Sequence, residues 1–99
     1  MGASDNRLLT AEQLDAALAD LDGWALADTR LFKQFRFAGF PAAIAFMTEV
    51  AFAAARLDHH PNWSNVYDRV EVELWSHDLG GVSARCVELA AAMNQIASR

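Results

Sequence analysis

Residues 57–75, LDHHPNWSNVYDRVEVELW, hold the transition that decides the fold. Pro61 disfavours helical backbone at the residue before it, so an apolar helix that precedes this stretch has to end here. Trp63 to Tyr67 has the composition of a strand. In residues 70–75, buried-type apolar side chains alternate with Glu and Trp, which is typical of a half-buried strand. With a tight turn expected at Asp68-Arg69, the stretch predicts a helix, a loop and a β-hairpin in succession.

The residues before this stretch predict a long apolar helix. Pro41 suits the first turn of a helix, because its missing N–H needs no partner there, so we expect the helix to run from about Pro41 to Leu57. Two apolar stripes follow it: Phe40, Ile44, Met47, Ala51 and Ala54 on one side, and Phe46, Val50, Ala53 and Leu57 on the other. A helix that is apolar on two sides is expected to be buried on two sides. We therefore predict a homo-oligomer, dimer or tetramer, in which one side of this helix meets its own sheet and the other meets another subunit.

Both ends of the chain extend the same pattern. A Thr-x-x-Gln capping box at Thr10 opens a helix expected over residues 11–21. A hairpin is expected from residues 24–27 and 31–37, joined by a turn at 28–30. After Gly80-Gly81, Ser83 is placed to cap a last helix whose apolar stripe is Cys86, Leu89, Met93 and Ile96. The order α-β-β-α-β-β-α predicts an α+β fold, a four-stranded antiparallel sheet with three helices packed on one face, formed by residues 1–99 as a single domain.

Composition excludes several classes of protein. Hydrophobic residues make up 54% of the 99 residues, which excludes disorder, and a net charge of −5 without a basic run argues against direct nucleic-acid binding. A single cysteine, Cys86, excludes an intrachain disulfide and favours a reducing compartment. The start of the chain has no signal-peptide pattern, and the apolar stretch 40–55 looks too short and too interrupted to span a bilayer. We therefore expect a cytoplasmic protein without a membrane partner.

The three histidines, His59, His60 and His77, fall in or just after the opening stretch. A metal site is a weak interpretation, because adjacent histidines rarely reach one metal and only Cys86 could add a further His or Cys ligand. Nucleophilic catalysis is weaker still, because Cys86 lies on a predicted apolar stripe, where a buried structural thiol is expected.

General acid–base catalysis suits these residue types best, since imidazole exchanges protons near neutral pH. The loop after the long helix and the end of the fourth strand are expected to meet, because the strands beside them pair; Trp63 and Trp75 would add flat apolar walls. In the structural alternative, His59 and His60 interact with the dipole at the C-terminus of the helix, while Trp63 and Tyr67 are core aromatics. The residue pattern alone leaves both interpretations open.

The blocks LDHHPNWSNVYDRVEVEL, WSHD and LGGVS, together with LFKQFRF at residues 31–37, closely resemble the pterin-4a-carbinolamine dehydratases. These are also called 4a-hydroxytetrahydrobiopterin dehydratases, and in eukaryotes the family includes the dimerisation cofactor of a homeodomain transcription factor. The resemblance covers nearly the whole chain. It implies a hydro-lyase that dehydrates 4a-hydroxytetrahydropterin to quinonoid dihydropterin, recycling the cofactor of aromatic amino-acid hydroxylases without a metal or organic cofactor.

The resemblance also implies roles for particular residues. His59, His60 and His77 match the three active-site histidines of the family, which act as acid and base; the resemblance does not say which histidine takes which role. Asp58, Pro61 and Trp63 match the wall of the pterin pocket, and Ser76 and Asp78 match a polar pair that flanks the third histidine.

Two positions depart from the family pattern. The family commonly carries acidic residues where this chain has Ala55 and Cys86, and such acids could orient an imidazole or raise its pKa. Asp58, Asp78 or Glu88 could compensate. The acid at position 86 could equally have a structural role, completing the helix cap that Ser83 begins. These departures keep a second hypothesis open: a catalytically weakened member of the fold that acts as a pterin-binding or protein-interaction (dimerisation) module.

Overall fold

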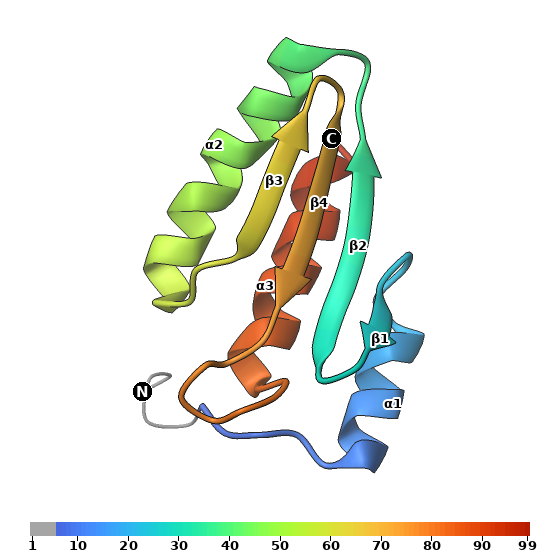
Figure 1. The fold of residues 1–99 in the computed structure, drawn as a ribbon, viewed down its shortest axis with the longest axis vertical. Helices are drawn as coiled ribbons and strands as arrows, with labels where there is room; N and C mark the ends of the chain where they lie inside the picture. The colour runs from blue at the N-terminus through green and yellow to red at the C-terminus, as the bar shows by residue number, and fades with distance from the viewer. Residues whose placement is uncertain (1–5) are drawn as a thin grey trace.

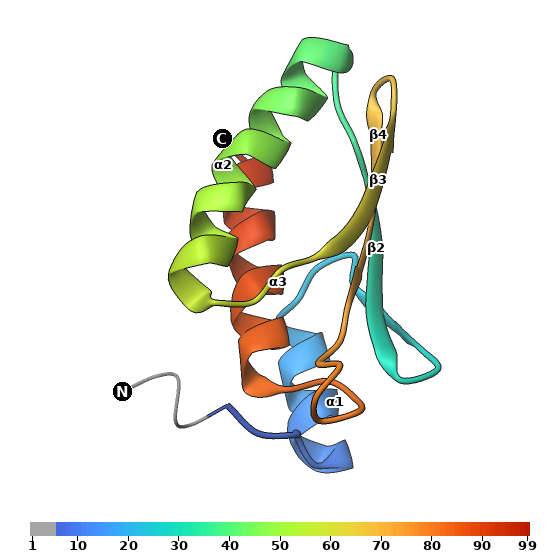
Figure 2. The ribbon, with the colours of Figure 1, turned by 60° about the vertical axis from the view of Figure 1, so that its left-hand side comes forward.

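Four strands form one antiparallel sheet, and the helices lie on one of its faces (Figures 1 and 2). The structure is a computed structural model that describes residues 6–99. Its elements are α1 (Ala11–Ala19), β1 (Ala25–Ala27), β2 (Arg30–Arg36), α2 (Phe40–Leu57), β3 (Asn62–Val66), β4 (Arg69–Leu74) and α3 (Ala84–Ala97). The strand order across the sheet is β1-β2-β4-β3. The predicted fold class and element order are confirmed.

The alternation in β4 explains why the sheet has one covered face. Val70, Val72 and Leu74 are fully buried, whereas Glu71 and Glu73 remain partly exposed. Because successive side chains of a strand point to opposite faces, the three apolar residues face the helices and the two glutamates face solvent. The core is completed by apolar residues of β2, α2 and α3, chiefly Leu31, Phe35, Phe46, Val50, Leu89 and Met93.

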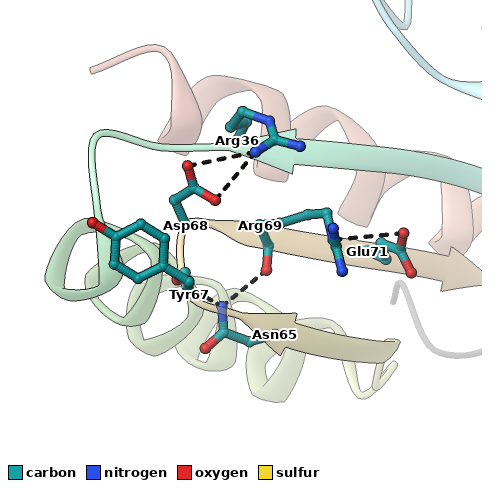
Figure 3. Close-up of polar contacts among 6 residues, drawn as sticks. All are labelled: Arg36, Asn65, Tyr67, Asp68, Arg69 and Glu71. Atoms are coloured by element: carbon teal, nitrogen blue, oxygen red, sulfur yellow. Dashed lines mark hydrogen bonds and ion pairs between the residues drawn. The ribbon is translucent and has the colours of Figure 1, made fainter.

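The β3–β4 turn lies one residue earlier than expected. Tyr67 and Asp68 form the turn, and Arg69 already belongs to β4. Tyr67 has a φ of +53°, a conformation that short hairpin turns use but that tyrosine does not predict. The Asn65 amide donates to the carbonyls of Tyr67 and Arg69 at 3.1 and 2.9 Å, and Arg36 pairs with Asp68 at 3.2 Å (Figure 3). These two hydrogen bonds and the ion pair hold the turn at Tyr67 and Asp68.

Helix α1 ends two residues before its expected end, at Ala19. Its Thr10 capping box is present as predicted, with Gln13 as the reciprocal partner. The chain then turns so that Leu21 becomes buried in the core. Leu21 therefore continued the apolar spacing of the helix in the sequence, although it lies outside the helix, and this made the predicted end too late.

Helix α2 has one buried side and one exposed side. The buried side consists of Ala43, Phe46, Val50, Ala53 and Ala54. The exposed side presents Phe40, Ile44 and Phe52, of which Phe52 is 70% exposed although it belongs to neither predicted stripe. By length and composition alone, α2 is also apolar enough to cross a membrane, although residues 40–55 looked too short for this. A helix that packs one side against the core of its own protein can have the same length and composition, and α2 packs one side in that way.

A polar cluster under the sheet ties α3 to the α1–β1 loop and to β2. Asn94 Oδ1 accepts hydrogen bonds from Trp24 Nε1 at 3.0 Å and Lys33 Nζ at 2.8 Å, and its amide nitrogen donates to the Asp22 carbonyl at 3.0 Å. Lys33 Nζ also donates to the Asp22 carbonyl. Partial burial lowers the pKa of Lys33, and the nearby Asp22 carboxylate opposes this effect.

We expect Asn94→Ala to lower the free energy of unfolding by about 1–3 kcal/mol, because the buried Trp24 N–H would lose its acceptor. Gln95→Ala, an exposed position on the same helix, is the control and should change it by no more than about 0.5 kcal/mol. Urea unfolding followed by tryptophan fluorescence measures both. Equal effects of the two variants would contradict a stabilising role for the cluster.

Candidate active site

The pairing of β3 with β4 brings two loops together. Asn62, the first residue of β3, pairs with Glu73, one residue before β4 ends at Leu74. Because the strands are antiparallel, the loop that enters β3 and the loop that leaves β4 lie at the same end of the sheet (Figure 1). The N-terminus of α3 follows the second loop and lies at the same end.

The first loop begins with a sharp reversal at the end of α2. Asp58 adopts the left-handed conformation (φ 52°, ψ 45°), and its N–H donates to the carbonyls of the last turn. The His59 N–H donates to the Ala54 carbonyl at 3.0 Å. Pro61 then prevents the chain from resuming a helix at His60. The cap therefore fixes where the two adjacent histidines leave the helix.

The second loop is closed by hydrogen bonds around Ser76. Its N–H donates to the Gly81 carbonyl at 2.7 Å, its carbonyl accepts from Gly80 N–H at 2.8 Å, and its hydroxyl accepts from Leu79 N–H at 3.2 Å. Gly80 has a φ of +77°, which favours glycine. This closed loop presents the exposed side chains of His77 and Asp78.

A pocket of about 420 Å³ lies between the two loops and the start of α3. It is lined by Asn6, Asp58, His59, His60, Pro61, Asn62, Trp75, Ser76, His77, Asp78 and Arg85. The structure therefore brings seven of the eight predicted site residues round one pocket, including all three histidines. The exception is Trp63.

Trp63 does not line this pocket. It pairs with Val72, whose side chain is fully buried on the helix-covered face, and it packs partly buried against the core. Period-two alternation thus turns Trp63 away from its neighbour Asn62, which does line the pocket. The aromatic wall is Trp75, whose ring lies 4.5 Å from the His77 ring, centroid to centroid, and 4.0 Å from the Arg30 guanidinium carbon.

His59 is the buried histidine of the three, and it contacts a thiol. Its Nε2 lies 3.3 Å from Sγ of Cys86, which is fully buried. The same sulfur accepts a hydrogen bond from the Ser83 N–H at 3.4 Å and lies 3.4 Å from the Ser83 hydroxyl. Cys86 therefore takes the acceptor position of a capping box at the start of α3 while it also contacts the pocket histidine.

Burial keeps both members of this contact uncharged at neutral pH. Burial lowers the pKa of His59, the positive charges of Arg85, His60 and His77 lower it further, and Asp58 opposes them. Burial raises the pKa of the Cys86 thiol, against the hydrogen bonds from Ser83. The contact therefore joins a neutral imidazole to a protonated thiol, and it differs from the thiolate–imidazolium pair of a nucleophilic cysteine.

Comparison with known proteins matches one family over most of the chain. A family model described as pterin 4 alpha carbinolamine dehydratase matches residues 7–96. The chain is 53% identical over 87 residues to a protein of Prochlorococcus marinus (strain MIT 9303) named "Putative pterin-4-alpha-carbinolamine dehydratase", covering 88% of this chain and 91% of that protein. A protein of the same name from Rhodopseudomonas palustris (strain BisB18) is 50% identical over 93 residues, covering 92% of each chain.

The chain belongs to the pterin 4 alpha carbinolamine dehydratase family. The crystal structure of a transcriptional coactivator/pterin dehydratase from Brucella melitensis superposes with a TM-score of 0.87 at 41% identity, covering 90% of this chain and 97% of that one. The resemblance identified from the sequence is therefore confirmed, for the fold as well as for the family.

Sequence reasoning missed part of the wall that this family member builds. Arg85 N–H donates to Oδ1 of Asn6 at 3.2 Å, and Ala84 N–H donates to the Arg7 carbonyl at 3.0 Å. Asn6 is 79 residues from Arg85, so no local pattern could have paired them. Arg85 could have been suspected as a site residue, because it is a cation next to position 86, where the family pattern led us to expect an acid.

The two positions at which the resemblance led us to expect acids differ in their surroundings. Ala55 is exposed on α2 outside the pocket lining, whereas Cys86 is buried against His59. Of the three candidate substitutes for the expected acids, Asp58 and Asp78 line the pocket, and Glu88 is exposed on α3 outside it. Within residues 6–99, no group of three His, Cys, Asp or Glu side chains is arranged to hold a metal ion.

We expect Cys86 in the folded protein to react with a maleimide at least about tenfold more slowly than in urea, because it is buried and its thiolate is disfavoured. The control is Cys86→Ser combined with Ser98→Cys, which places the single thiol at the exposed C-cap position of the same helix. Mass spectrometry against time gives both rates. Equally fast labelling of the two proteins would show that Cys86 is accessible.

Proposed function

We propose that this chain removes water from a 4a-hydroxytetrahydropterin by histidine acid–base catalysis and releases the quinonoid dihydropterin. The observation that carries the proposal is the convergence of His59, His60 and His77, from two separate loops, on one pocket with Trp75 as a flat wall. Membership of the dehydratase family supports it. A separate reductase would have to add two electrons and two protons to this product before an aromatic amino-acid hydroxylase could use it again as the tetrahydropterin cofactor.

The reaction requires two proton transfers and involves no change of oxidation state. The bond between carbon 4a and the hydroxyl oxygen breaks as an imidazolium protonates the oxygen, which leaves as water. The electrons of the N5–H bond form the double bond between N5 and carbon 4a as a neutral imidazole removes the proton. General acid and general base each contribute typically about 10² to 10⁴ to a rate. Imidazoles supply both roles at neutral pH, so the proposed reaction needs neither a metal nor an organic cofactor.

The pocket has the properties that this substrate requires. A pterin is a flat heterocycle with polar edges, and Trp75 offers an aromatic surface beside the polar groups of Ser76 and Asp78. His60 and His77 are exposed, so their imidazoles can reach a ligand in the pocket and exchange protons with water. His59 lines the same pocket and is the buried histidine of the three.

We expect His60→Ala and His77→Ala each to lower kcat/KM by at least tenfold, about 1.4 kcal/mol, because each would remove a group proposed to transfer or stabilise a proton. The rate of quinonoid dihydropterin formation by purified protein, at matched folded fraction, measures this. Gln95→Ala, which lies outside the pocket lining, is the control and should keep the parent rate, and a chelator should leave all rates unchanged. Parent rates in both histidine variants would contradict the proposal.

The alternative is that the chain is a catalytically weakened member of the family that binds a pterin or another protein. Cys86 and Ala55, in place of the expected acids, favour it. Ala55→Glu separates the two functions, because it restores one of the two expected acids at an exposed position. If the parent protein is active, a gain of less than tenfold, or none, supports an enzyme that already works without this acid. The appearance of an activity that the parent lacks supports the alternative.

We also propose that the chain forms a homo-oligomer, dimer or tetramer, through the exposed side of α2. Phe40, Ile44 and Phe52 expose 48%, 39% and 70% of their surface there, and an apolar patch of this kind is an aggregation liability in a monomer. A second copy of the same side would cover it.

We expect Phe52→Asp combined with Ile44→Asp to convert the oligomer to a monomer, because two carboxylates would be desolvated in the interface. Leu26→Asp, which alters an exposed leucine of β1, is the control and should leave the assembly intact. Multi-angle light scattering at micromolar concentration gives the masses. A monomer mass for the unmodified protein would contradict the proposal outright.

A further inference from the structure

Cys86 is a buried thiol that touches a pocket histidine and has no place in the two proton transfers proposed above. Its Sγ lies 3.3 Å from His59 Nε2, and its own position is fixed by the N–H and hydroxyl of Ser83. This arrangement places an uncharged group where the family pattern leads us to expect a carboxylate. The question is what an uncharged partner does to the histidine.

We propose that Cys86 is a positioning residue that holds His59 as a neutral imidazole, so that His59 serves as the proton acceptor and the acid role falls to His60 or His77. The proposal rests on the dehydratase function proposed above. It assigns different roles to three histidines that the sequence left equivalent.

The geometry fixes the orientation of the His59 ring. Nε2 is engaged by the fully buried sulfur, and the backbone N–H of His59 is held by the Ala54 carbonyl at the end of α2. Nδ1 of His59 has no hydrogen-bond partner among residues 6–99, so it is the ring nitrogen left for a ligand. Nδ1 accepts a proton only in the tautomer whose Nε2 carries the ring hydrogen, so the proposal has Nε2–H donating to Sγ of the thiol. A ring anchored at one nitrogen presents the other in a constant direction, as proton transfer requires.

The charges around His59 favour its neutral form. Arg85 faces it from α3, His77 from the loop after β4, and His60 from its own loop, and each of these opposes a positive charge on the ring. Asp58, at the end of α2, is the group that favours the charge. The thiol of Cys86 adds no negative charge, so burial and the cations dominate, in agreement with the lowered pKa of His59.

A neutral imidazole is suited to only one of the two transfers. It can accept the N5 proton, but it cannot deliver the proton of an imidazolium to the departing hydroxyl. The acid must therefore be one of the other two histidines of the pocket, His60 or His77, whose side chains are exposed.

The test is a pH titration of the histidine side chains by ¹H–¹⁵N NMR, which needs no substrate. In the parent protein, His59 should keep the spectrum of a neutral imidazole below the ordinary histidine pKa of about 6.5. Cys86→Asp should raise its pKa by at least about one unit, since a carboxylate within about 4–6 Å favours the imidazolium. Met93→Leu, a buried change on the same helix, is the control for altered packing and should leave the titration unchanged.

The pH profile of kcat/KM then tests the division of roles. If His59 is the base, activity falls as pH drops through its pKa, so Cys86→Asp should move this limb to higher pH. Cys86→Ser, which keeps a small polar partner, should retain more activity than Cys86→Ala.

Three results would contradict these assignments. An ordinary His59 titration in the parent, or one that Cys86→Asp leaves unchanged, overturns the positioning role. A titration that moves while the pH limb stays fixed overturns the assignment of His59 as base. The expected titrations in a protein that forms no quinonoid dihydropterin support the positioning role and overturn the proposed dehydratase function instead.

Discussion

The antiparallel pairing of β3 with β4 is the constraint on which the rest of the structure depends. One hairpin buries the apolar side of β4 under the helices and places the loop before β3 beside the loop after β4. A slip of one residue in this register would expose Val70, Val72 and Leu74. It would also move the histidines of the two loops out of their present alignment. The same hydrophobic alternation therefore specifies the core and assembles the pocket.

Most of the fold could be predicted because it follows from local patterns. The alternation in β4, the capping box at Thr10 and the proline after α2 each act within a few residues, and each lies where it was expected. The errors have equally local causes. Tyr67 takes a positive φ that its residue type does not predict, and the apolar Leu21 prolonged a helical pattern beyond the end of α1.

The site was less predictable, because it depends on which face each side chain takes and on contacts across the chain. Trp63 was assigned to the pocket from its place in a motif, although its strand position turns it toward the core. Cys86 was expected to be buried, and it is, but only the structure shows that its sulfur touches His59. A helix cap and an imidazole contact share one atom there, so a substitution at position 86 acts on stability and on the site together.

The N-terminal segment has a consequence for how the protein is made. The Leu9 N–H donates to the Val82 carbonyl, and Asn6 and Arg7 accept hydrogen bonds from the first turn of α3. Residues 6–9 are therefore held in place by residues 82–85, which are made much later. During synthesis, the segment around Asn6 leaves the ribosome long before α3 exists. The pocket therefore cannot be closed while the chain is growing, and its completion has to wait for the closure of a loop that spans most of the protein.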